Sequence, residues 1–270
     1  MCVSAAAAES PPGNAPAAAL CACESWQAID FVSDLHLGEH TPRTFLAFQR
    51  YLARTTADAV YVLGDLVELW VGDDALALPF ERRLAQILEA SSRQRVLGFM
   101  PGNRDFLLAA AMREACGFAA LADPCILDAW GRRVLLTHGD ALCVDDAEYQ
   151  AFRAQVRTPR WQREFLALPL AERQRRGSAM RRESEARRLR DPSAATADVD
   201  RRSALLWLEA ARAGDLVHGH THRPGSEKLA PGCTRHVLSD WELDSERPRA
   251  EVLRLTRAGF VRLAAEAAAP

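Results

Sequence analysis

Short runs of apolar and β-branched residues alternate along the chain with longer stretches in which apolar residues recur every three or four positions. The short runs cover residues 29–33, 59–63, 95–100, 134–137 and 216–217. The longer stretches cover residues 41–54, 79–91 and 105–116. This strand, helix, strand alternation predicts an α/β fold with a largely parallel sheet covered by helices. Two further apolar runs, at residues 236–239 and 250–263, predict strands that close the sheet.

The alternation stops after Gly139. Residues 146–211 show helical spacing with no strand between the pieces. We interpret this segment as an inserted helical cap, or lid, on a core formed by residues 26–145 and 212–270.

Arginine is concentrated in the middle of the predicted cap. Residues 173–190 contain eight arginines against two glutamates, Glu183 and Glu185. Such a run is typical of a solvated helix face, and a helix with basic and apolar faces can also lie on an anionic membrane surface. The apolar residues that flank the run are Trp161, Phe165, Leu166, Leu168, Leu170, Met180 and Leu189.

Composition excludes several classes of protein. The chain has 270 residues, 49% of them hydrophobic, which is enough for a sizeable core. A net charge of −2 gives no overall positive field for nucleic acid, and no apolar run reaches the roughly 18 residues of a membrane-spanning helix. Seven scattered cysteines indicate a reducing compartment rather than a disulfide scaffold. Residues 1–25 are rich in alanine and proline and lack lysine and arginine, so we expect a disordered tail rather than an export signal.

Polar residues gather where the predicted strands end. The clusters are Asp34-Leu35-His36, Gly64-Asp65, Gly102-Asn103-Arg104-Asp105, His138-Gly139-Asp140 and His218-Gly219-His220-Thr221-His222. Ligands of such sheets bind beyond the carboxyl ends of the strands. Carboxylate, amide and imidazole groups favour binding of Mn²⁺, Fe²⁺ or Zn²⁺. The absence of cysteine from every cluster argues against a structural zinc site. Seven candidate ligands with one shared carboxylate suit two ions roughly 3.5–4 Å apart.

Each cluster alone has a simpler explanation. A Gly-Asp pair after a strand is a common turn, and a lone histidine such as His138 is more often a hydrogen-bonded core residue. Three imidazoles at alternating positions in residues 218–222 are hard to explain by packing, because each needs a polar partner. The ordered set of five clusters therefore favours a metal centre.

The motif order D-x-H, G-D, G-N-x-D, H-G-D, H-G-H, from Asp34 to His222, resembles the calcineurin-like metallophosphoesterase superfamily. That resemblance implies a β-sandwich core flanked by helices. Most of the superfamily has histidine where this chain has Arg104, and the G-N-R-D form resembles one subfamily, the UDP-2,3-diacylglucosamine diphosphatases of lipid A biosynthesis. Longer strings similar to that subfamily are SDLHLG, YVLGDLVELWVGDD, GNRDFLL, LLTHGDALCVDDAEYQAFR and HGHTHRP.

The resemblance implies two Mn²⁺ ions per chain, bridged by Asp65. The implied ligands are Asp34, His36, Asp65 and His220 for one ion, and Asp65, Asn103, His138 and His218 for the other. His222 is expected just outside the ligand set. The implied substrate contacts are Asn103, Arg104, Asp146, Tyr149, Ser184, Arg188 and His218. Arg188 stands where the subfamily has asparagine, which changes both size and charge at that contact.

The implied reaction is hydrolysis of the diphosphate of UDP-2,3-diacylglucosamine. Metal-bound hydroxide would attack the α-phosphorus and release UMP and 2,3-diacylglucosamine 1-phosphate, with Asp65, Asn103 and Arg104 as catalytic residues. An arginine is no useful proton donor, but it can grip phosphate oxygens, and a phosphate monoester leaves without protonation. The apolar residues of the cap would cover the acyl chains.

Three other functions are compatible with parts of this pattern. A metallophosphoesterase with the same metal centre could act on a soluble nucleotide diphosphate or phosphoester. A binding protein without catalysis would predict damaged ligands, and a nuclease would predict basic residues along a groove of the core. The resemblance implies a glycolipid substrate as partner and peripheral contact with the anionic, cytoplasmic face of the inner membrane. We expect neither nucleic acid nor an obligate protein partner.

Overall fold

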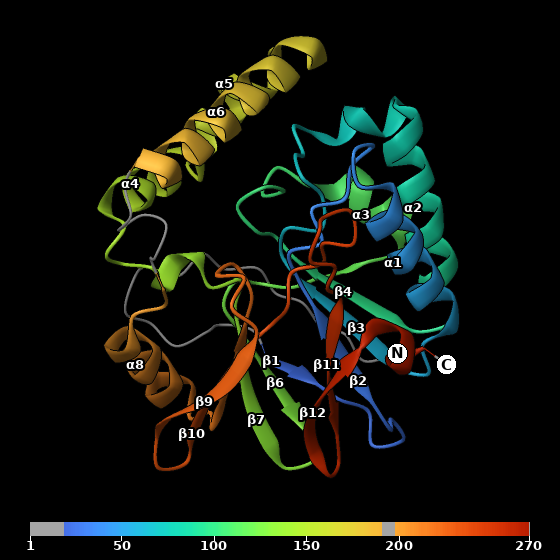
Figure 1. Ribbon diagram of the computed structural model, residues 1–270, viewed down its shortest axis with the longest axis vertical. Helices are drawn as coiled ribbons and strands as arrows, with labels where there is room; N and C mark the ends of the chain where they lie inside the picture. Colours follow the sequence, from blue (N-terminus) through green and yellow to red (C-terminus); the bar gives the residue numbers. More distant parts are fainter. Residues whose placement is uncertain (1–18, 191–197, 270) are drawn as a thin grey trace.

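Two six-stranded β-sheets pack face to face in the computed structural model, which describes residues 19–190 and 198–269 (Figure 1). The first sheet consists, in spatial order, of β1 (Ala19–Cys21), β6 (Cys125–Ala129), β7 (Arg132–Leu136), β8 (Asp215–His218), β10 (Cys233–Val237) and β9 (Gly225–Ala230). The second consists of β12 (Gly259–Ala264), β11 (Glu251–Thr256), β2 (Ile29–Val32), β3 (Ala59–Leu63), β4 (Val96–Met100) and β5 (Ala119–Ala120). The β-sandwich implied by the resemblance is confirmed.

Alternating side chains of each strand enter two different cores. In β3, Ala59, Tyr61 and Leu63 lie in the core between the sheets, whereas Val60 and Val62 lie in the core under the helices. A strand buried on both faces is expected to be apolar at every position, as the sequence of β3 is.

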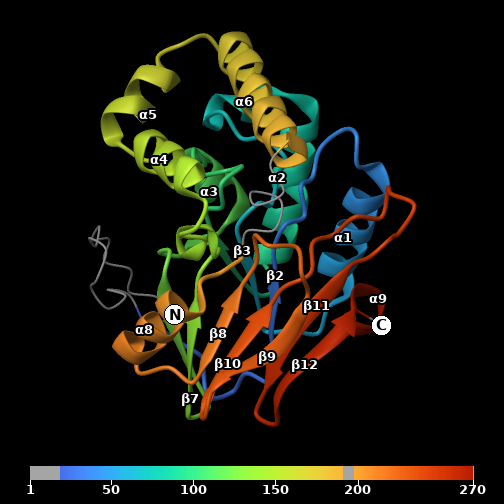
Figure 2. The ribbon, with the colours of Figure 1, turned by 60° about the vertical axis from the view of Figure 1, so that its left-hand side comes forward.

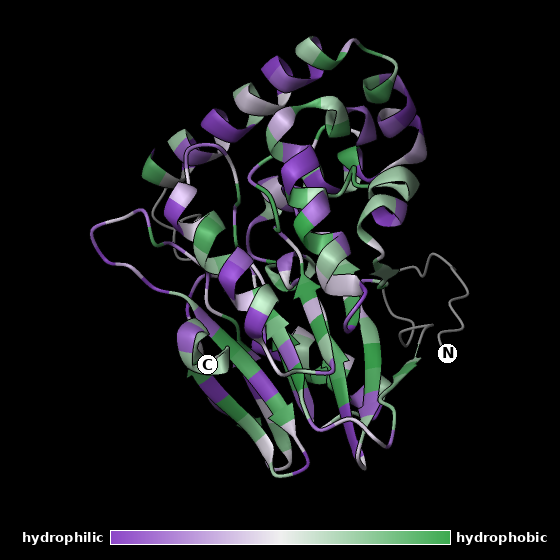
Figure 3. Cartoon of the chain, turned by 90° about the vertical axis from the view of Figure 1, so that its right-hand side faces the viewer, coloured by the Kyte–Doolittle hydropathy of each residue, from purple (hydrophilic) through white to green (hydrophobic). Residues whose placement is uncertain are grey.

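Helices cover the outer faces of both sheets. The second sheet carries α1 (Pro42–Arg54), α2 (Pro79–Ser92), α3 (Ala110–Cys116) and α9 (Ala265–Ala268), and the first sheet carries α8 (Arg201–Ala211). A short 3₁₀ helix, η1 (Asp73–Ala77), precedes α2, and another, η2 (Asp140–Leu142), follows β7. Figure 3 shows helices banded with hydrophilic and hydrophobic residues, as expected where one face lies on a core. None of the described helices has the length and hydropathy of a membrane span.

The sequence-based expectation of one largely parallel sheet is wrong. The strands β2 to β5 do run parallel, but β6 and β7 form an antiparallel pair, and β10 pairs antiparallel with β9. The helix expected from residue 105 begins at Ala110. Asp105 accepts hydrogen bonds from the backbone N–H groups of Leu66 and Gly102, both at 2.7 Å, and these bonds favour a loop at this point.

Three helices form a cap beyond the carboxyl ends of the strands (Figure 2). They are α4 (Ala147–Val156), α5 (Pro159–Leu166) and α6 (Leu170–Arg190). Asp146 begins α4 by accepting a hydrogen bond from the Tyr149 N–H at 3.0 Å. Thr158 begins α5, with Pro159 in the first turn, by accepting one from the Trp161 N–H at 3.3 Å.

Two expected boundaries differ from the structure. The cap was expected to reach residue 211, but Ala204 and Leu208 of α8 share a core with Leu216 of β8, because α8 buries its apolar face on the first sheet. The tail was expected to reach residue 25, but Ala19–Cys21 pairs as β1, parallel to β6. Residues 1–18 of that tail lie outside the described residues.

Candidate active site

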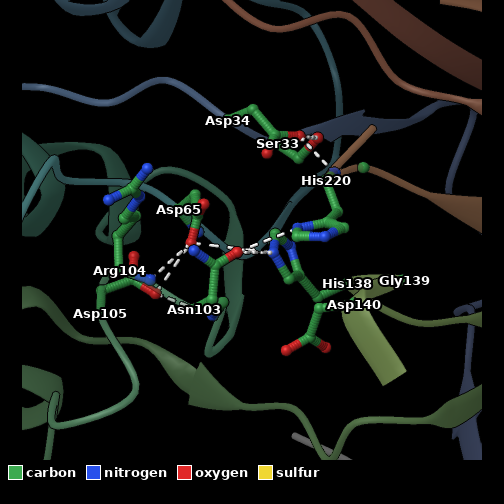
Figure 4. A network of polar contacts seen from close by, with 12 residues as sticks. Ser33, Asp34, Asp65, Asn103, Arg104, Asp105, His138, Gly139, Asp140 and His220 are labelled. Atoms are coloured by element: carbon green, nitrogen blue, oxygen red, sulfur yellow. Dashed lines mark hydrogen bonds and ion pairs between the residues drawn. The ribbon is translucent and has the colours of Figure 1, made fainter. Parts of the chain in front are cut away.

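The strand-end clusters meet at one edge of the sandwich (Figure 4). Asp34 follows β2, Asp65 follows β3, Asn103 follows β4 and His138 follows β7. Among the described residues, seven other than glycine have a positive φ, and five of these are Asp34, His36, Asp65, His220 and His222. Left-handed backbone is unfavourable for residues with a Cβ and is concentrated at functional sites.

Asp34 lies among imidazoles. Its Oδ1 is 3.3 Å from His222 Nε2, which is itself 3.3 Å from His36 Nε2. Its Oδ2 accepts hydrogen bonds from Ser33 Oγ at 2.6 Å and from the His220 backbone N–H at 2.9 Å. Burial alone would raise the pKa of Asp34, but His222 and the other histidines outweigh burial and lower this pKa below its ordinary value. The carboxylate is therefore ionised.

The two carboxylate oxygens of Asp65 face different imidazoles. Oδ2 lies 3.9 Å from His36 Nε2, and Oδ1 lies 3.7 Å from His138 Nε2. His138 Nδ1 donates to the Leu63 carbonyl oxygen at 2.9 Å, which directs its Nε2 into the site. Burial would lower the pKa of His138, but Asp65 and Asp34 raise it to about 9. A field that attracts a proton so strongly also attracts a metal cation.

Asn103 joins two of the histidines. Its Oδ1 is 3.1 Å from His138 Nε2 and 2.9 Å from His220 Nδ1. The two imidazole rings lie 5.2 Å apart between centroids, and the ring of Tyr149 in the cap lies 5.8 Å from that of His220. These contacts bring together the loops after β4, β7 and β8 and the first cap helix.

The donor atoms fit a divalent cation. Two groups of side chains offer ligand atoms within 4.8 Å of one another, namely Asp34, His36 and His222, and Asp34, Asp65 and His138. Asp34 Oδ1 is buried and makes no well-aligned hydrogen bond among the described residues. Carboxylate oxygens and imidazole nitrogens without thiolate are the ligands of ions such as Mn²⁺ or Fe²⁺.

His218 is placed differently from the other expected ligands. It is the last residue of β8, its Nδ1 lies 2.8 Å from the Gly219 carbonyl oxygen, and its Nε2 accepts a hydrogen bond from Arg235 Nε at 2.8 Å. Burial, with help from Arg235, lowers the pKa of His218 to about 4. The neutral ring therefore has both nitrogens engaged in protein hydrogen bonds.

Two glycines permit the close approach of the loops. Gly64 has a φ of +90°, and a Cβ at this residue would collide with the ring of His138. A Cβ at Gly102 would collide with the Asp65 carboxylate. The G-D and G-N pairs therefore require glycine for steric reasons.

The sequence suggested no role for two acidic residues near the centre. Asp105 holds the loops after β3 and β4 together through its backbone hydrogen bonds, and burial, together with Asp65, raises its pKa to about 7. The G-N-R-D string contained this residue. Glu68, three positions after Asp65, lies beside Arg104 and His36; the string YVLGDLVELWVGDD contained this residue but gave it no role. His222, expected outside the ligand set, offers a ligand atom within 4.8 Å of those of Asp34 and His36.

A cavity of about 300 Å³ lies between the cap and the loops after β3 and β4. Its polar lining includes Asn103, Arg104, Tyr149 and Ser184. Its apolar lining includes Leu69, Val71, Phe106, Trp161, Phe165 and Met180. The cavity therefore combines a guanidinium and other polar groups with a hydrophobic wall.

Asp146 and His218 are expected substrate contacts that are not in this lining. Asp146 caps α4 and forms an ion pair with Arg187 of α6. Arg188 belongs to α6, but its side chain lies outside the part of the chain that the structure describes.

Most arginines of α6 have acidic partners. Arg173 pairs with Asp74 of η1, and Arg181 pairs with Glu68 of the core. The other pairs join Arg175 and Arg176 to Glu172, Arg187 to Asp146 and Glu148, and Arg190 to Glu183. The helix is therefore much less of an uncompensated positive surface than its local sequence indicates.

Comparisons with known proteins agree with this geometry. The family model of calcineurin-like phosphoesterases matches residues 28–224. A UDP-2,3-diacylglucosamine hydrolase of Ralstonia nicotianae is 44% identical, and the match covers 84% of this chain and 88% of that protein. Proteins of the same name from Chromobacterium violaceum and Escherichia coli are 43% and 41% identical, and each match covers 79% of this chain and 90% or 91% of the relative.

Proposed function

Because this chain belongs to the calcineurin-like phosphoesterase family, we propose that it is a metal-dependent UDP-2,3-diacylglucosamine hydrolase of lipid A biosynthesis. The products would be UMP and 2,3-diacylglucosamine 1-phosphate, formed by water attack at the α-phosphorus. One structural observation carries the proposal. The cavity that contains Asn103 and Arg104 is also walled by apolar side chains of the cap, which suits a substrate with both a diphosphate and acyl chains.

Family membership implies divalent metal binding, and we propose two Mn²⁺ ions. The first would be held by Asp34, His36, Asp65 and His220, and the second by Asp65, Asn103, His138 and His218. His218 would join this set by exchanging one of its present hydrogen bonds for the metal. Bound divalent ions supply an activated water nucleophile and neutralise phosphate oxygens.

The protein side chains would bind and orient the diphosphate. The backbone N–H of Arg104 donates to Asp65 Oδ1 at 2.9 Å, and its carbonyl oxygen accepts from the Trp70 N–H at 3.0 Å, so the residue is fixed at both ends. Its guanidinium, which lines the cavity, can bind two phosphate oxygens as negative charge develops on them. The leaving group is a phosphate monoester, which departs without a proton donor, so arginine can occupy this position.

The remaining polar residues of the site would contact the nucleotide and sugar. Tyr149 and Ser184 line the cavity from α4 and α6, and Asn103 lies beside the metal centre. We also propose contacts from Asp146, Arg188 and His218 on the basis of their motif positions.

The apolar part of the cavity would hold acyl chains. Trp161 and Phe165 stack with ring centroids 4.7 Å apart, and Phe106 lies 6.1 Å from Trp161. Each buried CH₂ group contributes about 0.8 kcal/mol to binding. A diacylated substrate would therefore be favoured strongly over an unacylated sugar nucleotide.

We propose that the enzyme reaches its substrate by peripheral contact with the cytoplasmic face of the inner membrane. The cap offers exposed apolar side chains for this contact, including Leu189, which is 89% exposed, and Leu166. Arg182 of α6 is also exposed. Flotation with vesicles should show binding that increases with anionic lipid, and binding that ignores lipid charge and salt would contradict this contact.

One assay tests the proposed activity. Purified protein supplied with Mn²⁺ should release UMP, identified by mass, from UDP-2,3-diacylglucosamine. UDP-N-acetylglucosamine is the matched control, because it has the same diphosphate and no long acyl chains. Equal turnover of both would favour the alternative, a phosphoesterase for soluble nucleotide diphosphates or phosphoesters, and release of UDP would exclude attack at the α-phosphorus.

A further inference from the structure

Glu68 stands where the metal centre, the phosphate-binding arginine and the cap meet. Its Oε2 lies 3.5 Å from His36 Nδ1, and its Oε1 lies 3.9 Å from an Arg104 terminal nitrogen. The same Oε1 lies 2.7 Å from Arg181 Nε of α6. Three segments that are distant in sequence therefore converge on one carboxylate, whose side chain is only 13% exposed.

The backbone holds Glu68 in this place. Its N–H donates to the Leu37 carbonyl oxygen at 3.1 Å, within a short parallel bridge between Leu37 and Val67. Backbone hydrogen bonds thus join the loop that contains Glu68 to the loop that contains His36, whatever side chains these two residues carry. A carboxylate fixed in this way can orient its partners rather than follow them.

Each contact has a definite chemical consequence. His36 Nδ1 lies 3.5 Å from Glu68 without an aligned hydrogen bond, and a proton that the carboxylate held at Nδ1 would leave the lone pair on Nε2, the nitrogen that faces Asp65. Glu68 and the guanidinium of Arg104 lie within ion-pair distance, so the carboxylate can help to orient the guanidinium. Arg181 brings α6 to the same oxygen, so the cap and Arg104 share one carboxylate oxygen as ion-pair partner.

We propose that Glu68 is a positioning residue that sets the orientation of His36 and Arg104 and couples both to the cap through Arg181. Only the predicted effects on turnover of UDP-2,3-diacylglucosamine rest on the proposed function. If Glu68 couples the metal centre to the cap, loss of its charge should weaken metal binding and also increase the backbone mobility of α6. Loss of the Arg181 charge should increase the mobility of α6 without weakening metal binding.

The chain offers a matched control. Glu185 of α6 is the second carboxylate beside Arg181, at 3.1 Å, and it is 49% exposed. The Glu185→Gln change removes the same charge from the same arginine without touching His36 or Arg104. It should leave metal affinity and turnover unchanged.

The experiment compares Glu68→Gln, Arg181→Met, the double variant and Glu185→Gln. Mn²⁺ affinity, measured by calorimetric titration without substrate, should fall about 10- to 100-fold in Glu68→Gln and stay unchanged in Arg181→Met. Backbone hydrogen exchange of α6 should increase in both single variants, with no further increase in the double variant.

Kinetics supply the third measurement. With UDP-2,3-diacylglucosamine at saturating Mn²⁺, kcat should fall about 10-fold in Glu68→Gln, and KM should rise in Arg181→Met. The proposed role of Glu68 would be refuted by an unchanged Mn²⁺ affinity in Glu68→Gln. It would also be refuted if the increases in α6 hydrogen exchange of the two single variants added up in the double variant. Because these two measurements need no substrate, they decide the inference even if the protein cleaves a different phosphoester.

If Glu68→Gln unfolds, the comparison of Arg181→Met with Glu185→Gln still tests the link between Glu68 and α6. Equal backbone hydrogen exchange of α6 in these two variants would refute that link.

Discussion

The Tyr149 hydroxyl donates a hydrogen bond of 2.6 Å to Asp140 Oδ2, and this bond fastens the first cap helix to the loop that follows His138. Arg153 Nε donates to the same oxygen at 2.8 Å. Burial alone would raise the pKa of Asp140, but Arg153, His138 and Arg157 outweigh it and hold the pKa below its ordinary value. A buried, ionised carboxylate therefore joins cap and core.

Asp140→Asn should destabilise the fold, because it removes the nearer of the two carboxylates that pair with Arg153, in a mostly buried position. Breaking a buried ion pair costs about 3–5 kcal/mol, measurable by urea unfolding. The control is Glu164→Gln, in an exposed pair with Arg160, for which less than about 1 kcal/mol is expected. Equal effects in the two variants would show that the cap does not depend on Asp140.

The same carboxylate makes stability depend on pH. A carboxyl whose pKa is depressed on folding contributes stability above its unfolded pKa of about 3.9, and this contribution is lost as pH falls below that value. The wild-type protein should therefore lose stability between about pH 5 and pH 2 more steeply than Asp140→Asn. Parallel stability curves for the two proteins over this range would contradict a depressed pKa.

Asp65→Asn should release metal and nearly abolish turnover. Asp65 faces His36 with one oxygen and His138 with the other, so an amide in its place weakens both proposed ion sites at once. We expect a loss of at least about 100-fold in activity and a fall in bound Mn²⁺ measured by elemental analysis. Asp128→Asn, in a half-exposed pair with Arg133, is the control. Two tightly bound ions in Asp65→Asn would refute the bridge.

The strand-end argument succeeded where the sheet itself brings residues together. Asp34, Asp65 and Asn103 follow neighbouring parallel strands, and such strands share one carboxyl edge. The contact of His218 with Arg235 could not be predicted in this way, because it depends on the pairing of β8 with β10, and β9 lies between these two strands in the sequence.

The ion pairs of the arginine-rich helix could not be predicted for a similar reason. Arg173 finds its partner Asp74 at a separation of 99 residues, so a local count of charges misses the pair. The cap boundary failed because helical spacing alone does not say which core a helix covers, and α8 covers the first sheet.

Arg104→His should reduce kcat/KM without loss of metal. The guanidinium can bind two phosphate oxygens, whereas an imidazole offers one donor in that direction. Removal of a single stabilising donor costs about 10²–10³-fold in rate, and we expect a loss in this range with unchanged Mn²⁺ content. Arg113→His, at an exposed position of α3, is the control. Full activity of Arg104→His on the lipid substrate would mean that this residue does not grip the phosphate.

Gly177→Ala should shift the enzyme towards shorter acyl chains. Gly177 lines the cavity from α6, and a Cβ there would lie 2.9 Å from a Leu69 methyl carbon and 3.1 Å from Val71, so we expect the added methyl group and the shifted side chains to reduce the space for acyl chains. Each CH₂ group displaced from the apolar wall costs about 0.8 kcal/mol, or about fourfold in kcat/KM. The measurement is the ratio of kcat/KM for long-chain and short-chain substrates. Ala179→Ser, at an exposed position of the same helix, should leave the ratio unchanged, and an unchanged ratio in Gly177→Ala would place the acyl chains elsewhere.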